Sequence, residues 1–77
     1  NLILNGKEIK VLNAEFKKAK TKNTGKIVEI DKHNLGISCK DGIIYLKRIK
    51  PFGKKEMNIN SFVNGINTSD YLNKVVD

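Results

Sequence analysis

The 77-residue chain holds 15 lysines and arginines against 8 acidic residues, for a formal net charge of +7. That length supports one small domain and excludes a second hydrophobic core. No apolar stretch approaches the roughly 20 residues of a membrane-spanning helix or has the flanks of a secretory signal, so we expect a cytoplasmic protein. Cys39 is the single cysteine, which excludes an intramolecular disulfide, and one histidine is too few to complete a zinc site with it.

The positive charge attracts phosphate groups or anionic lipid to the surface. Lysine carries almost all of it, with Arg48 as the one arginine. Paired guanidinium contacts to bases are therefore not expected, whereas lysine contacts to a phosphate backbone are. The chain is also rich in isoleucine and asparagine, a bias that AT-rich coding produces in any protein. Charge alone leaves a solvated basic surface open as the alternative.

The first elements are two strands joined by a tight turn. Asn5-Gly6 stands between an apolar run at 2–4 and an alternating run from Lys7, which is the strongest short-range signal of a two-residue β-hairpin. The lysine-rich stretch at 17–26 predicts a loop. A change of parity near Leu12-Asn13 predicts a β-bulge. The bulge would place four apolar residues on one face: Ile9, Val11, Ala14 and Phe16.

Three further strands are predicted in the middle of the chain. Two apolar runs, 27–30 and 35–39, are separated by a tight polar reversal. Asp41-Gly42 predicts a second hairpin turn into a strand at 43–49. Pro51 has no N–H to donate to a ladder and ends that strand.

One short helix is predicted after these strands. Asn58 is placed to cap residues 59–64, and Gly65 supplies a left-handed C-terminal stop. Residues 66–77 have a weak apolar pattern that fits a final strand or a helical turn.

Five or so short strands with tight turns predict a mainly β fold, a small barrel of the OB or SH3-like kind. Its core should hold the apolar residues of the inward-facing parities and of the helix. These residues are Ile9, Val11, Phe16, Val28, Ile30, Ile37, Cys39, Ile44, Leu46 and Phe62.

Residues suited to catalysis are scarce in this sequence, which contains no Gly-rich phosphate loop, no HExxH motif and no paired Cys or His ligands. Ser38 and Ser61 fall in a predicted strand and helix. Cys39 shares a face with Ile37 and is expected to pack as a small hydrophobic residue. His33 falls in a surface turn. We expect no catalysis by this chain alone.

The aromatic residues raise the possibility of base stacking, because single-strand binders on barrels present aromatic rings beside basic groups. Phe16 and Phe62 are expected in the core. Tyr45 and Phe52 are the exposed candidates for stacking.

The lysines form two clusters, one in the loop at 17–26 and one between the end of a strand and the start of the helix. Pro51, Gly53 and the Asn58 cap would hold the second cluster in a fixed frame, so less entropy is lost when it meets a phosphate. A solvated face is the alternative for both clusters. The candidate RNA-binding residues are Lys54, Lys55, Lys50, Lys26, Lys22 and Lys20.

Residues 42–65, GIIYLKRIKPFGKKEMNINSFVNG, combine a Gly, alternating apolar residues, the sequence Gly-Lys-Lys-x-Met and a short helix with a Phe. In this order they resemble the C-terminal domain of methionyl-tRNA formyltransferase. Residues 4–11 and 24–42 look like the preceding strands of that domain. The resemblance implies a mainly β, OB-like barrel of the Greek-key type, with five to six strands and one short helix. It carries over Gly53 for the turn, Lys54 and Lys55 for the basic surface, and Met57 for packing beneath the helix.

The resemblance also implies a function. It makes residues 1–77 a single C-terminal barrel domain that follows a Rossmann-type catalytic domain and helps to hold initiator methionyl-tRNA. In the family the N-terminal domain transfers a formyl group from 10-formyltetrahydrofolate and contains the catalytic Asn, His and Asp. No catalytic, cofactor-binding or metal-binding residue is therefore expected here. We expect a monomer whose partners are the tRNA and its own N-terminal catalytic domain.

Two departures from the family pattern are visible. Lys50 stands where the family often has glutamine, and the residues after Gly65 do not follow the usual ending. Related formyltransferases that act on sugar nucleotides or aldehydes carry a similar barrel. A barrel that packs against an adjoining enzyme without touching RNA is therefore the alternative.

Overall fold

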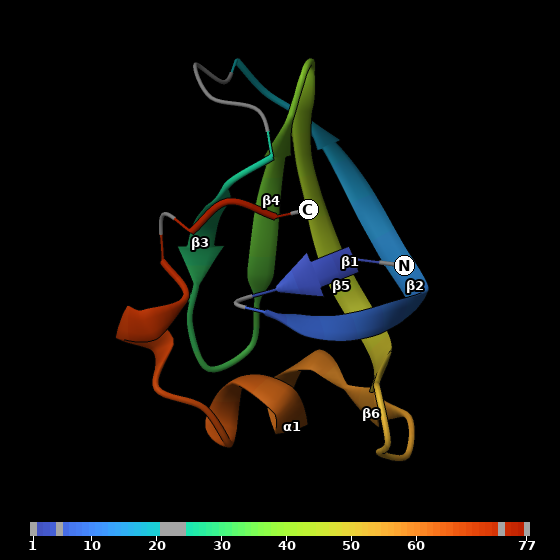
Figure 1. The fold of residues 1–77 in the computed structure, drawn as a ribbon. Coiled ribbons are helices and arrows are strands. Elements are labelled where there is room, and N and C mark those ends of the chain that lie inside the picture. Colours follow the sequence, from blue (N-terminus) through green and yellow to red (C-terminus); the bar gives the residue numbers. More distant parts are fainter. Residues whose placement is uncertain (1, 5, 21–24, 73, 77) are drawn as a thin grey trace.

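The computed structural model describes residues 2–4, 6–20, 25–72 and 74–76. One antiparallel sheet has the strand order β1-β2-β5-β4-β3, and β6 pairs with β5 off that path. The strands β3, β4 and β5 are consecutive neighbours, and β5 returns to lie beside β2, which is the strand order of a Greek key. The prediction of a mainly β fold is confirmed (Figure 1). The elements are β1 (Leu2–Leu4), β2 (Lys7–Lys18), β3 (Ile27–Ile30), β4 (Leu35–Cys39), β5 (Gly42–Pro51), β6 (Met57–Asn58), the helix α1 (Ile59–Asn64) and the 3-10 turn η1 (Thr68–Asp70).

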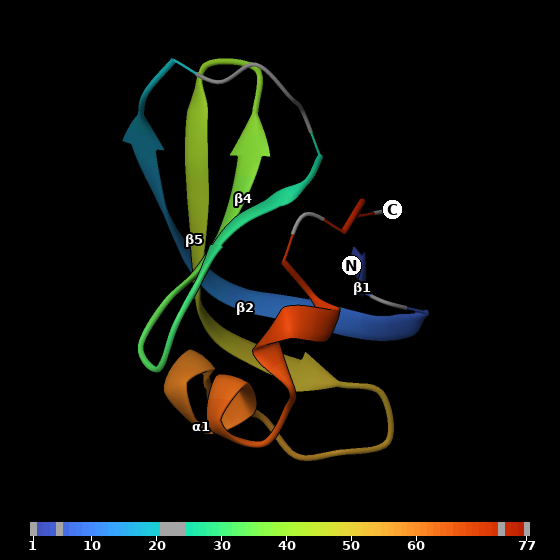
Figure 2. The same ribbon diagram turned by 90° about the vertical axis from the view of Figure 1, so that its left-hand side faces the viewer.

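The C-terminal segment joins the two edges of this sheet. Val76 forms a bridge with Leu4 of β1, and Val75 forms one with Lys26, directly before β3. The N–H of Val76 also donates to the carbonyl of Gly25 at 2.6 Å. Figure 2 shows this segment between β1 and the start of β3. The tail therefore supplies both of the predicted alternatives, a helical turn and strand-like pairing, and it closes the curled sheet.

The core fills the curled sheet, and α1 lies across one end of it (Figure 1). From α1, the ring of Phe62 meets the ring of Tyr71 edge-on, with centroids 6.0 Å apart. Full burial of a Val, Leu, Ile or Phe side chain stabilises the folded state by roughly 1.5–3 kcal/mol. The buried residues are Leu4, Ile9, Ile27, Leu35, Ile37, Leu46, Ile49, Ile59, Phe62, Val63 and Tyr71.

The predicted core is correct at its centre and wrong at its margins. Ile9, Ile37, Leu46 and Phe62 are buried, and Val11, Ile30 and Cys39 are half-buried. The predictions for Phe16, Val28 and Ile44 are wrong, because these side chains are 58%, 38% and 36% exposed.

The exposed pair Phe16 and Ile44 nevertheless lies on the core face. The two residues are directly opposite each other, and Ile44 is also opposite the buried Ile37. Directly opposite residues share a face of the sheet. The predicted bulge is present, with register shifts on both sides of Asn13. These strands continue past α1 in Figure 1, so the core face is uncovered there. Val28 is exposed for another reason, since it alternates with the buried Ile27.

The turns agree with the sequence in part. Leu4 pairs with Lys7 and Gly6 has a φ of 79°, as a two-residue hairpin requires; Asn5 lies outside the described residues. The predicted loop at 17–26 starts later, because Lys17 and Lys18 belong to β2. Its residues 21–24 are also outside the described part.

The predicted turn at Asp41-Gly42 is wrong by one residue. Cys39 pairs with Gly42, so Lys40 and Asp41 form the turn and Gly42 opens β5. Glycine is required there for space, because a Cβ would clash with the carbonyl oxygen of Lys17 and lie 2.8 Å from the ring of Phe16.

The helix has the predicted bounds, 59–64, but not the predicted stop. Gly65 has a φ of −99°, outside the left-handed region. Its N–H donates to the carbonyl of Phe62 at 3.1 Å. This three-residue spacing tightens the last turn in 3-10 fashion, so no left-handed residue is needed.

Candidate RNA-binding site

The turn between β5 and β6 is a tightly bonded structure. The N–H of Lys54 donates to the carbonyl of Pro51 at 2.9 Å, and Gly53 has a φ of 77°. Glycine with positive φ at the third position is typical of a type II turn. The N–H of Phe52 donates to the carbonyl of Glu8 in β2 at 3.0 Å. The turn is therefore fixed both within itself and to the neighbouring strand.

Arg48 ties the far side of this turn to β5. Its Nε and Nη2 donate to Oε1 of Glu56 at 3.1 and 2.7 Å, and its Nη1 donates to Oδ1 of Asn58 at 2.8 Å. Asn58 occupies the N-cap position of α1 but forms no side-chain cap hydrogen bond. The predicted capping role of its side chain is therefore wrong, because its amide oxygen accepts from Arg48 instead.

Met57 anchors the same segment from the inside. It pairs with Ile49 of β5 and packs, half-buried, against the core. The glycine and the methionine of Gly-Lys-Lys-x-Met thus have the places that the sequence predicts for them.

The lysines of this turn lie on the surface of the domain. Lys50, Lys54 and Lys55 are exposed, and Lys10 of β2 lies directly opposite Lys50. None of these four lysines forms an ion pair within the described residues. Like charges directly opposite each other across two strands repel, and an anion bound between them relieves that repulsion. Sequence reasoning misses Lys10, because only the register of the strands reveals its position.

Lys20 follows the end of β2 and Lys26 precedes the start of β3, and these strand ends lie at the opposite end of the molecule from the β5–β6 turn (Figure 1). Lys20 is exposed, and the N–H of the preceding Ala19 donates to the carbonyl of Asp41 at 3.1 Å. Lys26 is half-buried in the bridge to Val75. Lys22 lies outside the described residues. The structure thus separates the predicted set into two surfaces.

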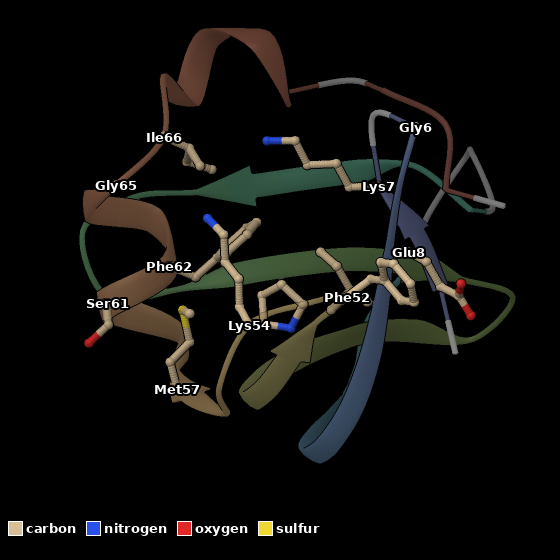
Figure 3. Close-up of a pocket in the computed structure, with 12 residues that line it drawn as sticks. Gly6, Lys7, Glu8, Phe52, Lys54, Met57, Ser61, Phe62, Gly65 and Ile66 are labelled. Atoms are coloured by element: carbon tan, nitrogen blue, oxygen red, sulfur yellow. The ribbon is translucent and has the colours of Figure 1, made fainter.

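A groove of about 610 Å³ runs from the β1–β2 turn to α1, beside the turn that carries Lys54. Apolar side chains of Ile9, Met57, Phe62 and Ile66 line it, and Phe52 and Lys54 belong to its rim. In Figure 3 the side chains of Lys7 and Lys54 both extend toward Ile66. The groove therefore combines an apolar floor with two ammonium groups.

The two candidates for base stacking differ in what surrounds them. Tyr45 donates its hydroxyl to Oε1 of Glu29 at 3.2 Å, and Nζ of Lys47 lies 5.9 Å from its ring centroid. A Cβ on Gly36 would be 3.0 Å from the same ring. Burial and then the charge of Glu29 raise the pKa of Tyr45. Phe52, in contrast, is 83% exposed, and it is the better stacking candidate.

Asp31, His33 and Asn34 share the β3–β4 turn and have the residue types of the family's catalytic set. Oδ1 of Asp31 accepts hydrogen bonds from the backbone N–H groups of His33 and Asn34, each at 2.8 Å. The bond from His33 is the largest cause of a lowered pKa for Asp31. The carboxylate is thus used by the turn itself.

The family model described as the formyl transferase C-terminal domain matches residues 1–67. The chain belongs to this domain family. The resemblance seen in Gly-Lys-Lys-x-Met is thereby confirmed. The match ends at 67, before the bridges of Val75 and Val76.

Curated relatives of this formyl transferase domain are methionyl-tRNA formyltransferases. The chain is 36% identical to that of Finegoldia magna over 63 residues, 80% of this chain and 20% of the relative. It is 37% identical to that of Staphylococcus epidermidis over 67 residues, 86% and 22% of the two chains. It is 39% identical to that of Rickettsia bellii over 72 residues, 92% and 22%. The chain thus spans about a fifth of the length of the relatives it matches.

The described part of the domain offers neither a cluster of metal ligands nor a membrane-spanning helix. Across residues 2–4, 6–20, 25–72 and 74–76, no three His, Cys, Asp or Glu side chains gather as metal ligands would. In the same residues, no helix has the length and apolar character to span a membrane.

Proposed function

We propose that this domain helps a methionyl-tRNA formyltransferase to hold initiator methionyl-tRNA for N-formylation in translation initiation, in the cytoplasm. One observation carries the proposal: Lys54 and Lys55 project from a bonded turn and have no ion-pair partner in the described structure. A fixed frame lowers the entropy lost on binding. Lys50 and Lys10, opposite each other on β5 and β2, add to the basic surface next to the turn.

The chemistry of the surface suits phosphate contacts. A lysine ammonium is a compact point charge, whereas base recognition in forks is the property of arginine. Arg48 is already bonded to Glu56 and Asn58. Contacts to phosphates position a nucleic acid without reading its sequence. The domain would therefore orient the tRNA, and discrimination of the initiator would lie elsewhere.

The formyl transfer itself is assigned to a separate catalytic domain, which the proposal makes a partner of this one. In this proposal 10-formyltetrahydrofolate is used by that catalytic domain. Here Oδ1 of Asp31, which is close in sequence to His33, accepts hydrogen bonds from backbone N–H groups. The exposed Phe16 and Ile44 favour a second role for this domain, a contact with that catalytic domain.

Binding of initiator tRNA tests the proposal. The double variant K54A/K55A should keep its melting temperature, because exposed substitutions usually change stability by within about ±0.5 kcal/mol, and should bind tRNA more weakly than the parent. The matched variant K18A/K20A removes the same charge at the opposite end and should lose less affinity. Equal losses of tRNA affinity for both variants would mean that the lysines of the turn contribute only through the net charge of the domain. No binding by the parent would favour the packing role.

A further inference from the structure

We propose that Phe52 is a stacking platform for an unpaired RNA base, with lysines on both sides of the ring placed for the adjoining phosphates. This inference rests on the proposed tRNA binding and specifies that the nucleotide bound at Phe52 is single-stranded. Phe52 is 83% exposed, the highest exposure among the large hydrophobic residues in the described structure. An exposed phenylalanine ring on a fixed turn offers an open aromatic face to a base.

The backbone that carries the ring is held in place. Phe52 donates its N–H to Glu8, and the adjoining Pro51 and Lys54 close the turn. Pro51 is buried, so the backbone next to Phe52 is anchored in the domain. A platform held in this way loses little conformational freedom when a base stacks on it.

Two hollows adjoin Phe52, and each holds a pair of lysines. The groove described above includes Lys7 and Lys54. A second hollow of about 220 Å³ includes Lys10 and Lys50, and Glu8 lines it as well. In Figure 3 the ring of Phe52 is seen between the side chains of Lys54 and Glu8, and the Glu8 carboxylate points away from the groove. A strand crossing the turn could therefore stack one base on Phe52 and place phosphates in either hollow.

This arrangement favours single-stranded RNA over a duplex or a protein. Stacking needs an open face of a base, and the bases of a duplex already stack on their neighbours. A protein partner for an apolar ring would not call for four lysines. The remaining acidic residue of the turn, Glu56, is held by Arg48. The surface around Phe52 therefore suits a polyanion with exposed rings.

The test uses the 77-residue chain with an oligoadenylate and with the same oligonucleotide carrying abasic residues. F52L keeps an apolar side chain but removes the aromatic face. F52L should bind oligoadenylate about fivefold or more weakly than the parent, since stacking contributes roughly 1–3 kcal/mol per base. The abasic oligonucleotide should bind parent and F52L equally. F16L, which removes another exposed ring, should bind oligoadenylate within about twofold of the parent.

The variant F52W provides an independent signal, because the chain contains no other tryptophan. It should bind at least as tightly as the parent, and its fluorescence should be quenched by oligoadenylate and not by the abasic oligonucleotide. Equal affinity of F52L and parent for oligoadenylate would overturn the stacking role of Phe52. Failure of the parent to bind oligoadenylate while it still binds tRNA would overturn this inference alone, whereas failure to bind tRNA as well would overturn the proposed function with it.

Discussion

Arg48 donates two hydrogen bonds to Oε1 of Glu56, at 3.1 and 2.7 Å, and so joins β5 to the far side of the lysine turn. A third bond, to Asn58, extends the connection to the start of α1. Arg48, the one arginine of the sequence, is thus a structural support. The exposed lysines depend on this support for their fixed position.

Replacing Arg48 by alanine should therefore affect both stability and binding. R48A should lower the free energy of unfolding by about 0.5–1.5 kcal/mol, because the pair is partly exposed but bonded through several hydrogen bonds. It should also weaken tRNA binding by loosening the turn. Urea unfolding measures the first effect. K47A is the matched control. Lys47 is also in β5, and its Nζ lies 3.8 Å from Oε2 of Glu15 in β2, in an exposed pair that should contribute less.

Gly42 should tolerate no side chain. G42A would place a Cβ against the carbonyl oxygen of Lys17 and 2.8 Å from the ring of Phe16. We expect a loss of about 1–3 kcal/mol in the free energy of unfolding, the usual cost of overpacking. G65A is the control, because the nearest atoms to a Cβ there are 3.7 Å away and its φ is −99°. A G42A variant as stable as G65A would contradict the observed approach of the two strands.

The closure of the barrel by the tail can be tested with neighbouring valines. Val76 packs against the core and pairs with Leu4, whereas Val75 is 59% exposed. V76D should destabilise the domain by about 1–3 kcal/mol, since it brings a carboxylate to a partly apolar site. V75D should stay within about ±0.5 kcal/mol of the parent. Thermal melting of the two variants distinguishes a closed barrel from an open sheet, for which both should be neutral.

The Asx-type turn at Asp31 predicts a pH dependence. The backbone N–H of His33 is the largest cause that lowers the pKa of Asp31 below its ordinary value of 3.8. A lowered pKa adds stability that is present above 3.8 and is lost as the pH falls through the folded value. D31A should therefore melt below the parent at about pH 7 and together with it at about pH 2. A difference that persisted in acid would mean that the turn does not depend on the charge.

Much of the fold follows from local sequence signals. Gly6 and Pro51 fall where turn preferences place them, and the helix has the predicted bounds, 59 and 64, although neither cap has the predicted form. The position of the bulge also follows, because it restores one face to an apolar run. Such features depend on a few neighbouring residues, so sequence reasoning reaches them.

Features that depend on distant partners were not predictable. Whether Phe16 is covered depends on how far β2 extends past α1, and the glycine at 42 is explained by a strand that precedes it by more than 20 residues. The amide of Asn58 fits a cap until Arg48 is seen to bind it. The same limit applies to the site. Lys54 and Lys55 were found from a motif, whereas Lys10 and the two hollows around Phe52 appear only with the register of β2 and β5.

The most direct test of the central claim is the salt dependence of tRNA binding. An isolated domain that makes about three to five phosphate contacts should give a slope of roughly −2 to −4 in log K against log salt concentration. K54A/K55A should flatten that slope by about one to two units, because each lost contact releases about one counterion fewer. A slope that is the same for K54A/K55A as for the parent would contradict the claim that this turn holds the phosphates of the tRNA.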